Sequence, residues 1–183
     1  MEVVAALIDA LVGQWTVGRR ATSAELSATS KCPEWSVLDV IGHSIGVTMK
    51  FTDFVSVATD HPRSPSGDQV GGSIDLALRS SLVSAKLAWS SADKTRECHL
   101  PFGIFAAELA AGISLMDVLA HSWDIGLVRR ERFACRDEIW TVGLGVAHNL
   151  IGPGRDVRHY GEEVDVGSDA PPERRFLGYL GRS

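Results

Sequence analysis

Two nine-residue segments of the chain carry the same arrangement of an acid and a histidine. Residues 36–44 read SVLDVIGHS and residues 114–122 read SLMDVLAHS, so both follow the pattern S-x-x-D-V-[IL]-[GA]-H-S. An acid and a histidine four residues apart share one face of a helix, with about 5 to 6 Å between their Cβ atoms, and can bind one metal ion together. A single such pair is a weak signal in a chain with 23 acids and six histidines, but its repetition is a stronger one.

Both pairs lie within apolar segments that have the character of buried helices. Valine, isoleucine and leucine flank each pair, so the polar side chains are expected to face the interior. There an imidazole or carboxylate must be paired or bind a metal, because its desolvation alone is costly. If the two helices face each other in a bundle, His43, Asp117 and His121 form a three-ligand set. Three protein ligands leave positions open for water or substrate, which is typical of a catalytic metal site.

The same residues allow an interpretation without a metal. Each acid would then hydrogen-bond its own histidine or a helix N-terminus, leaving two satisfied histidines in the core. Asp39 fits this interpretation best, because it follows Ser36 by three residues and can complete a capping box at the start of a helix. Asp117 lies in the middle of a predicted helix, with no N-terminus to cap, and is the better candidate ligand. From the residues alone, both interpretations stay open.

The periodicity of apolar residues predicts the helices that would position these side chains. We expect four long helices followed by two shorter ones, at about 3–17, 36–59, 73–89, 104–128, 137–149 and 172–180. Residues 19–33 are expected to form a polar loop and residues 163–166 a short strand. Residues 61–68, with two prolines and a glycine, are the best candidate for a mobile lid. We therefore predict an all-α protein, with a metal-binding helical bundle at 1–132 and a C-terminal extension at 133–183 packed on it.

Composition and charge exclude several classes of function. The 183 residues are 45% hydrophobic and 22% charged, with a formal net charge of −5, which is typical of a globular domain with a core. No run of lysine and arginine provides the positive surface that nucleic-acid binding requires. The apolar stretches are shorter than the ~20 residues that span a bilayer, and no basic residues open a secretory signal. We expect a cytoplasmic protein that acts on a small molecule, without nucleic acid or membrane as partner; the sequence leaves a homodimer open.

The remaining polar residues of interest are expected to be structural. Three widely spaced cysteines without a C-x-x-C pair indicate neither a disulfide framework nor a thiolate zinc site; they are Cys32, Cys98 and Cys135. A helix start beside Cys32 would lower the pKa of its thiol, but no base is evident to pair with it. Trp123 is expected to pack between helices, Asp124 to cap a helix or bridge to a neighbour, and His148 to lie at a helix C-terminus.

Several segments of the chain together resemble one protein family. They are residues 32–37 (CPEWSV), 40–43 (VIGH), 118–126 (VLAHSWDIG), 168–172 (SDAPP) and 180–182 (LGR). In this order they resemble the actinobacterial branch of the DinB-like, mycothiol-dependent maleylpyruvate isomerase superfamily, over almost the whole chain. The resemblance implies a DinB-like four-helix bundle that holds a divalent metal, zinc first and nickel or iron as alternatives. By position, the implied ligands are His43, Asp117 and His121.

The chain departs from the family pattern at two places. Asp117 stands where the best-known isomerase has the longer glutamate, which bears on denticity and metal preference. Ser30-Lys31-Cys32-Pro33 replaces the usual Thr-Pro-Cys-Pro. Neither change removes a ligand.

What the resemblance implies about activity is broader than a single reaction. It implies a metal-dependent isomerase or S-transferase that uses a thiol, mycothiol, on a small electrophilic metabolite. A metal-assisted hydrolase or rearrangement enzyme of specialised metabolism, and a non-catalytic metal- or ligand-binding bundle, are the alternatives, because fold transfers between relatives better than reaction does. No catalytic or cofactor-binding residue is assigned at this stage.

Overall fold

The computed structural model shows that helices make up most of the chain. It describes residues 2–32, 34–56, 69–93, 95–100, 103–152, 155 and 160–183. The helices are α1 (Val3–Gly18), α2 (Ser23–Ser27), α3 (Val37–Ser56), α4 (Ile74–Ser90), α5 (Ala107–Arg129), α6 (Asp137–Ile151) and α8 (Pro172–Tyr179). Strands β1 (Glu97–Leu100) and β2 (Gly103–Ala106) form an antiparallel pair. Among the described residues, no helix is both long enough and apolar enough to cross a membrane.

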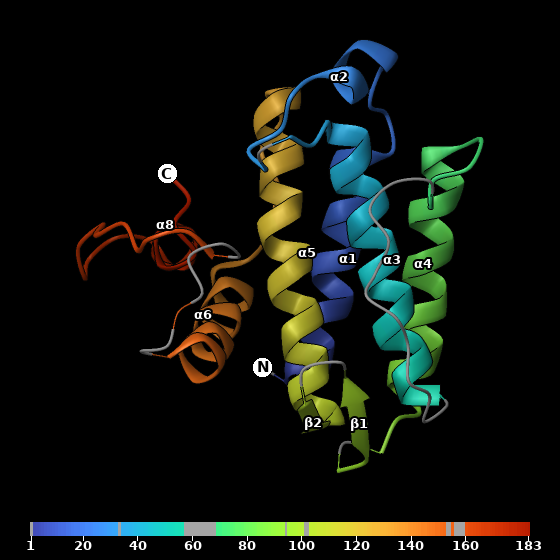
Figure 1. Cartoon of the computed structure of the whole chain (residues 1–183), viewed down its shortest axis with the longest axis vertical. Coiled ribbons are helices and arrows are strands. Elements are labelled where there is room, and N and C mark those ends of the chain that lie inside the picture. Colours follow the sequence, from blue (N-terminus) through green and yellow to red (C-terminus); the bar gives the residue numbers. More distant parts are fainter. Residues whose placement is uncertain are drawn as a thin grey trace.

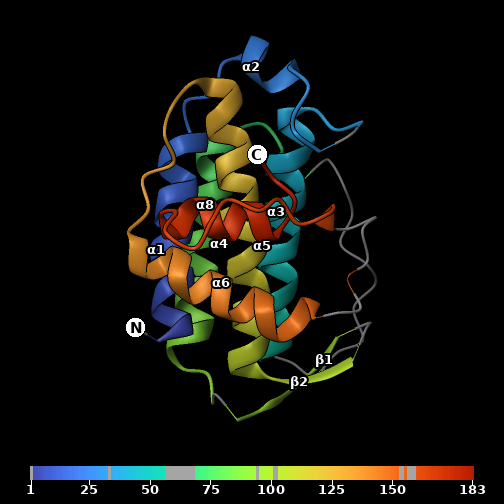
Figure 2. The same cartoon turned by 90° about the vertical axis from the view of Figure 1, so that its left-hand side faces the viewer.

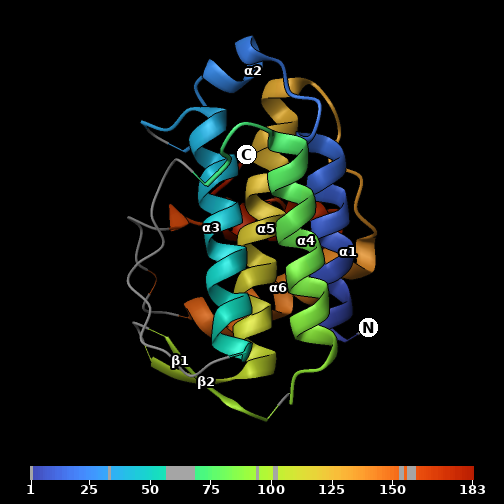
Figure 3. The same ribbon diagram turned by 90° about the vertical axis from the view of Figure 1, so that its right-hand side faces the viewer.

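The four long helices α1, α3, α4 and α5 lie side by side as a bundle (Figure 1). Seen from one side, α1, α3 and α4 stand in front of α5 (Figure 3). From the opposite side, α6 and α8 lie across the bundle in front of α5 (Figure 2). Helix α5 therefore has neighbours on most of its faces, and fifteen of its residues are buried. Most side chains of a helix that is covered in this way face other parts of the protein.

A capping box begins α3, as the sequence predicts. The hydroxyl and the backbone N–H of Ser36 donate to Asp39 Oδ2 at 2.6 and 2.9 Å, and the Asp39 N–H donates to Ser36 Oγ at 3.2 Å. These hydrogen bonds from Ser36 hold the pKa of the Asp39 carboxyl below its ordinary value. The acid of the first repeat is thus used at a helix start.

The region before α5 differs from the prediction. The fourth long helix begins at Ala107 instead of about residue 104, because residues 103–106 form β2, in which Phe105 pairs with Cys98. Exposure alternates along β2, and Ile104 is 59% exposed. A short apolar run cannot be assigned to strand or helix from periodicity alone, which is why this hairpin was not predicted.

Two other predicted connections also differ. The expected loop at 19–33 contains the short helix α2, which begins with a capping box between Thr22 and Glu25. The expected strand at 163–166 has no strand partner among the described residues, and the Val164 N–H donates instead to the Gly178 carbonyl in α8. The proposed lid at 61–68 and the expected end of α3 near residue 59 lie outside the described residues.

Helix α6 approaches its neighbours closely because one of its buried positions is a glycine. A Cβ atom at Gly143 would lie 2.6 Å from Leu119 Cδ1 and 3.2 Å from Phe176 Cε2, both in side chains that are fully buried. Gly145 is exposed on the same helix, and a Cβ there would meet nothing within 4 Å. The free energy of unfolding of Gly143→Ala should be lower than that of Gly145→Ala by about 1 to 3 kcal/mol, because the added methyl group at position 143 overpacks the core and forces its neighbours apart. Urea denaturation of both variants measures this difference; equal free energies of unfolding would contradict the packing.

Candidate metal centre

The three predicted ligands lie together between α3 and α5. His43 Nε2 is 3.2 Å from Asp117 Oδ1, and His121 Nε2 is 3.5 Å from the same oxygen. One donor atom from each residue lies within 4.8 Å of the other two. The side chains of His43, Asp117 and His121 are 21%, 16% and 11% exposed, so the cluster is enclosed but still reached by solvent. The spacing of four residues on α5 brings Asp117 and His121 together, and the packing of α3 against α5 adds His43.

The pKa directions in this cluster favour a negative charge on Asp117 and a positive charge at His121. Burial by itself would raise the pKa of Asp117, but the charge of His121 and the hydrogen bonds with His121 and His43 outweigh burial and hold that pKa well below its ordinary value. Burial would likewise lower the pKa of His121, and the Asp117 carboxylate instead raises it well above its ordinary value. The carboxylate thus attracts a positive charge to this place, either a proton on an imidazole or a metal cation.

A second carboxylate lies behind His121. Asp124 Oδ2 is 3.1 Å from His121 Nδ1, three residues further along α5. Arg182 binds Asp124 with two nitrogens, Nε to Oδ1 at 3.2 Å and Nη2 to Oδ2 at 3.1 Å. Burial of Asp124 would raise its pKa, but the hydrogen bond from His121 and the charge of Arg182 lower it. Asp124 is therefore an ionised acceptor for the His121 Nδ1–H, so the proton that His121 would give up to a metal is the one on Nε2.

These donors fit a divalent metal. Between His121 Nε2 and the Asp117 carboxylate oxygen there is a place for one positive charge, either the proton that the raised pKa of His121 keeps on the ring or a metal cation bound instead of it. Two imidazole nitrogens and one carboxylate oxygen are a ligand set that zinc and related metals accept. The contact from Asp124 to the outer nitrogen of His121 is the arrangement that commonly orients a metal-binding histidine.

The segment before α3 covers one side of the histidines. The Trp35 ring centroid lies 4.8 Å from that of His43 and 6.4 Å from that of His121. Cys32 Sγ lies 3.8 Å from His121 Nδ1 and 3.6 Å from Asp124 Oδ2. The prediction that no base pairs with Cys32 is therefore wrong. Its partners come from 89 and 92 residues away in the chain, and no local pattern reveals such contacts.

The C-terminal segment also contributes to this region. Arg182 lies beyond α8, and its side chain is only 17% exposed because it packs onto Asp124. Burial and the charge of Asp117 raise the pKa of Tyr160 above its ordinary value. The prediction that Asp124 bridges to a neighbour is confirmed, but the sequence did not reveal that this neighbour is Arg182. His148 lies in the last turn of α6, as predicted, with its ring 4.4 Å from that of Tyr179.

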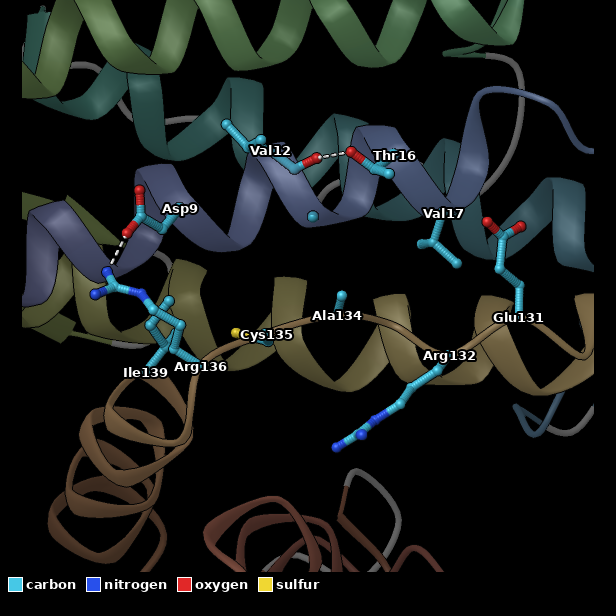
Figure 4. A pocket seen from close by; sticks show the side chains of 11 residues that line it. Asp9, Val12, Thr16, Val17, Glu131, Arg132, Ala134, Cys135, Arg136 and Ile139 are labelled. Atoms are coloured by element: carbon cyan, nitrogen blue, oxygen red, sulfur yellow. Dashed lines mark hydrogen bonds and ion pairs between the residues drawn. The ribbon is translucent and has the colours of Figure 1, made fainter.

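A cavity of about 270 Å³ lies between α1 and residues 131–136, apart from the histidine cluster (Figure 4). Its charged groups already have partners within the chain. Arg136 Nη2 is 2.5 Å from Asp9 Oδ2, and Glu131 Oε2 is 2.9 Å from Arg129 Nη1. Apolar side chains such as Val17 and Ile139 line the rest. This cavity therefore offers no free charged group to a ligand.

Cys135 lines the same cavity and is expected to be chemically inert. Burial raises the pKa of its thiol to about 12, and burial also raises the pKa of Cys98, which is 1% exposed. The thiolate is the reactive form, so iodoacetamide at pH 8 should modify neither residue in the folded protein and both in urea. Peptide mass spectrometry reads out each site. Rapid alkylation of Cys135 in the folded protein would contradict the raised pKa of its thiol.

Comparison with known proteins identifies the family to which the chain belongs. The sequence profile of the mycothiol maleylpyruvate isomerase N-terminal domain matches residues 9–126. Two Mycobacterium tuberculosis proteins, uncharacterized protein MT0763 of strain CDC 1551 and uncharacterized protein Rv0738 of strain H37Rv, are each 23% identical to the chain over 161 residues, or 87% of this chain and 86% of each relative. No solved structure matches significantly. The profile covers all three candidate ligands and Asp124, and ends before Arg182. The chain therefore belongs to the mycothiol maleylpyruvate isomerase N-terminal domain family.

Proposed function

We propose that this protein is a divalent-metal-dependent enzyme that uses a thiol, mycothiol, to isomerise a small electrophilic metabolite or to join the thiol to it. The observation that carries the proposal is the convergence of His43 Nε2, Asp117 Oδ1 and His121 Nε2 within 4.8 Å in a bundle of this family. Zinc is the metal that we favour, with nickel and iron as alternatives, because the donors are two imidazoles and one carboxylate.

A metal held by these three residues would act as a Lewis acid and would lower the pKa of a coordinated thiol or water towards neutrality. Three protein ligands leave room for such a group, which favours a catalytic over a structural role. The family match is what supports a thiol in that position. Thiolate addition to one carbon of an electron-poor carbon–carbon double bond, rotation about the single bond that results, and elimination of the thiolate would convert a cis isomer to the trans isomer. Addition followed by protonation of the other carbon would instead leave the thiol joined to the metabolite.

The surrounding residues have separable tasks. Asp124 keeps the proton of His121 on Nδ1, so that Nε2 faces the centre of the cluster. Arg182 neutralises Asp124 and keeps it in place through two hydrogen bonds. Trp35 packs beside both imidazoles and limits the access of water to them. The partial exposure of His43 and Asp117 leaves an approach from solvent that suits a small substrate.

Two measurements on protein purified without chelators or a metal-affinity tag test the proposal. Elemental analysis should find one equivalent of metal per chain, and chelation should remove it without loss of helical circular dichroism. A panel of small electrophiles, with maleylpyruvate included, should then react only with both metal and mycothiol present. Turnover with metal but without thiol would indicate the hydrolase alternative. The absence of bound metal, with none taken up on titration, would overturn the proposal.

A further inference from the structure

The second oxygen of Asp117 belongs to a buried chain of hydrogen bonds. Ser44 Oγ donates to Asp117 Oδ2 at 3.2 Å, and Gln14 Nε2 donates to Ser44 Oγ at 2.8 Å. Ser44 is fully buried and Gln14 is 1% exposed. The chain therefore runs from α1 through α3 to α5, with its first link in the core and its second at the partly buried carboxylate of Asp117.

The direction of this chain follows from the groups themselves. A carboxylate oxygen only accepts, and a serine hydroxyl has one proton. Ser44 must give that proton to Asp117, so Ser44 Oγ can only accept from its other neighbour. The Gln14 amide therefore turns its NH₂ group, and not its carbonyl, towards Ser44. An apolar residue in place of Ser44 would remove both links, whereas an apolar residue in place of Gln14 would remove only the link to Ser44.

Adjacent residues of α3 thus contact different oxygens of one carboxylate. His43 Nε2 lies 3.2 Å from Asp117 Oδ1, while Ser44 Oγ lies 3.2 Å from Oδ2. This division leaves Oδ1 directed at the two imidazoles and gives Oδ2 a partner on its other side. An amide buried on the core face of α1 is costly without such a purpose, because an apolar residue would fill that position more favourably.

We propose that Gln14 and Ser44 are positioning residues that make Asp117 a one-oxygen ligand. This inference rests on the proposed function, because it assumes a metal at His43, Asp117 and His121. With the chain intact, Asp117 presents Oδ1 alone to the metal and the coordination number stays low. Without it, Oδ2 is free to turn towards the metal, so that the shorter acid of this chain can chelate with both oxygens and the preference among metals changes.

The repeat provides a matched control. Ser122 follows His121 as Ser44 follows His43, and Ser122 is also fully buried. Its hydroxyl, however, has no hydrogen-bond partner among the described residues. Ser122→Ala therefore removes the same atom from an equivalent place next to a candidate ligand, without touching Asp117.

The experiment uses Co²⁺ as a spectroscopic probe in the metal-free full chain. Four-coordinate Co²⁺ absorbs visible light more strongly than five- or six-coordinate Co²⁺. Ser44→Ala should weaken these bands and lower Co²⁺ affinity roughly tenfold, as is common when a partner of a ligand is removed. Gln14→Met should change both in the same direction by less. The double variant should match Ser44→Ala, because the two residues act through one chain.

The possible outcomes separate this inference from the proposed function. If Ser44→Ala and Gln14→Met give the same spectrum and affinity as Ser122→Ala and the wild type, the chain is merely structural and the inference is wrong. If the wild type itself binds no Co²⁺ or Zn²⁺, the proposed metal site fails and the inference fails with it. Should Ser44→Ala not fold, Gln14→Met alone decides, because it keeps Ser44 and the volume of the side chain.

Discussion

Replacement of His121 by alanine is expected to lower metal affinity by at least about tenfold while the helical circular dichroism stays the same. His121 contacts two carboxylates: its Nε2 faces Asp117, a candidate metal ligand, and its Nδ1 faces Asp124, which orients the ring. Its loss removes a ligand and also leaves Asp124 without that neighbour. Competition with a chromophoric chelator, on protein reconstituted with Zn²⁺, measures the affinity directly.

A histidine outside the cluster serves as the control for this prediction. His148 is exposed on α6 and contacts the ring of Tyr179, so His148→Ala should bind metal as the wild type does. His43→Ala should resemble His121→Ala. Stoichiometric metal of wild-type affinity in either ligand variant would show that the ligand assignment is wrong.

The second large effect is expected on stability, from the ion pair behind the cluster. Asp124 is fully buried and Arg182 is largely buried, so Asp124→Ala leaves a guanidinium in the interior without its carboxylate. Removal of one partner of a buried pair commonly costs about 3 to 5 kcal/mol. We expect Asp124→Ala to lower the free energy of unfolding of the metal-free protein by about 3 kcal/mol, as measured by urea denaturation.

Comparison with a surface pair isolates the effect of burial. Arg132 and Glu173 are 3.3 Å apart, but Arg132 is 80% exposed, so Arg132→Ala should cost less than about 1 kcal/mol. The double variant Asp124→Ala/Arg182→Met should recover part of the stability that Asp124→Ala loses, because it no longer buries an unpaired charge. If Asp124→Ala were no more destabilising than Arg132→Ala, the pair would not be buried in solution.

The sequence predicts the helices and the Asp117–His121 pair because both depend on local spacing, and the repeat and the family resemblance add His43, which lies 74 residues from Asp117. Apolar periodicity identifies α1, α4 and α6 to within a few residues, and a spacing of four places Asp117 beside His121. Capping chemistry distinguishes Asp39 from Asp117, although the two occupy the same place in the repeat.

The contacts around the cluster could not be predicted in the same way. Ser44 lies 30 residues from Gln14, and Arg182 lies 58 residues from Asp124. Nothing in the local sequence of either pair indicates its partner, since a buried glutamine in α1 has the same helical pattern as a surface one. Such pairs are determined by how helices pack, and packing is visible only in three dimensions.

The distribution of these residues along the chain has a consequence for folding. The cluster and its supports draw on α1, α3, α5 and the segment after α8. Contacts over such long separations form later than local ones, because loop closure costs entropy before the contacts compensate for it. In a bundle that has collapsed before α8 docks, His43, Asp117 and His121 can meet, while Asp124 still lacks Arg182. High metal affinity would then require the complete fold, and not the bundle alone.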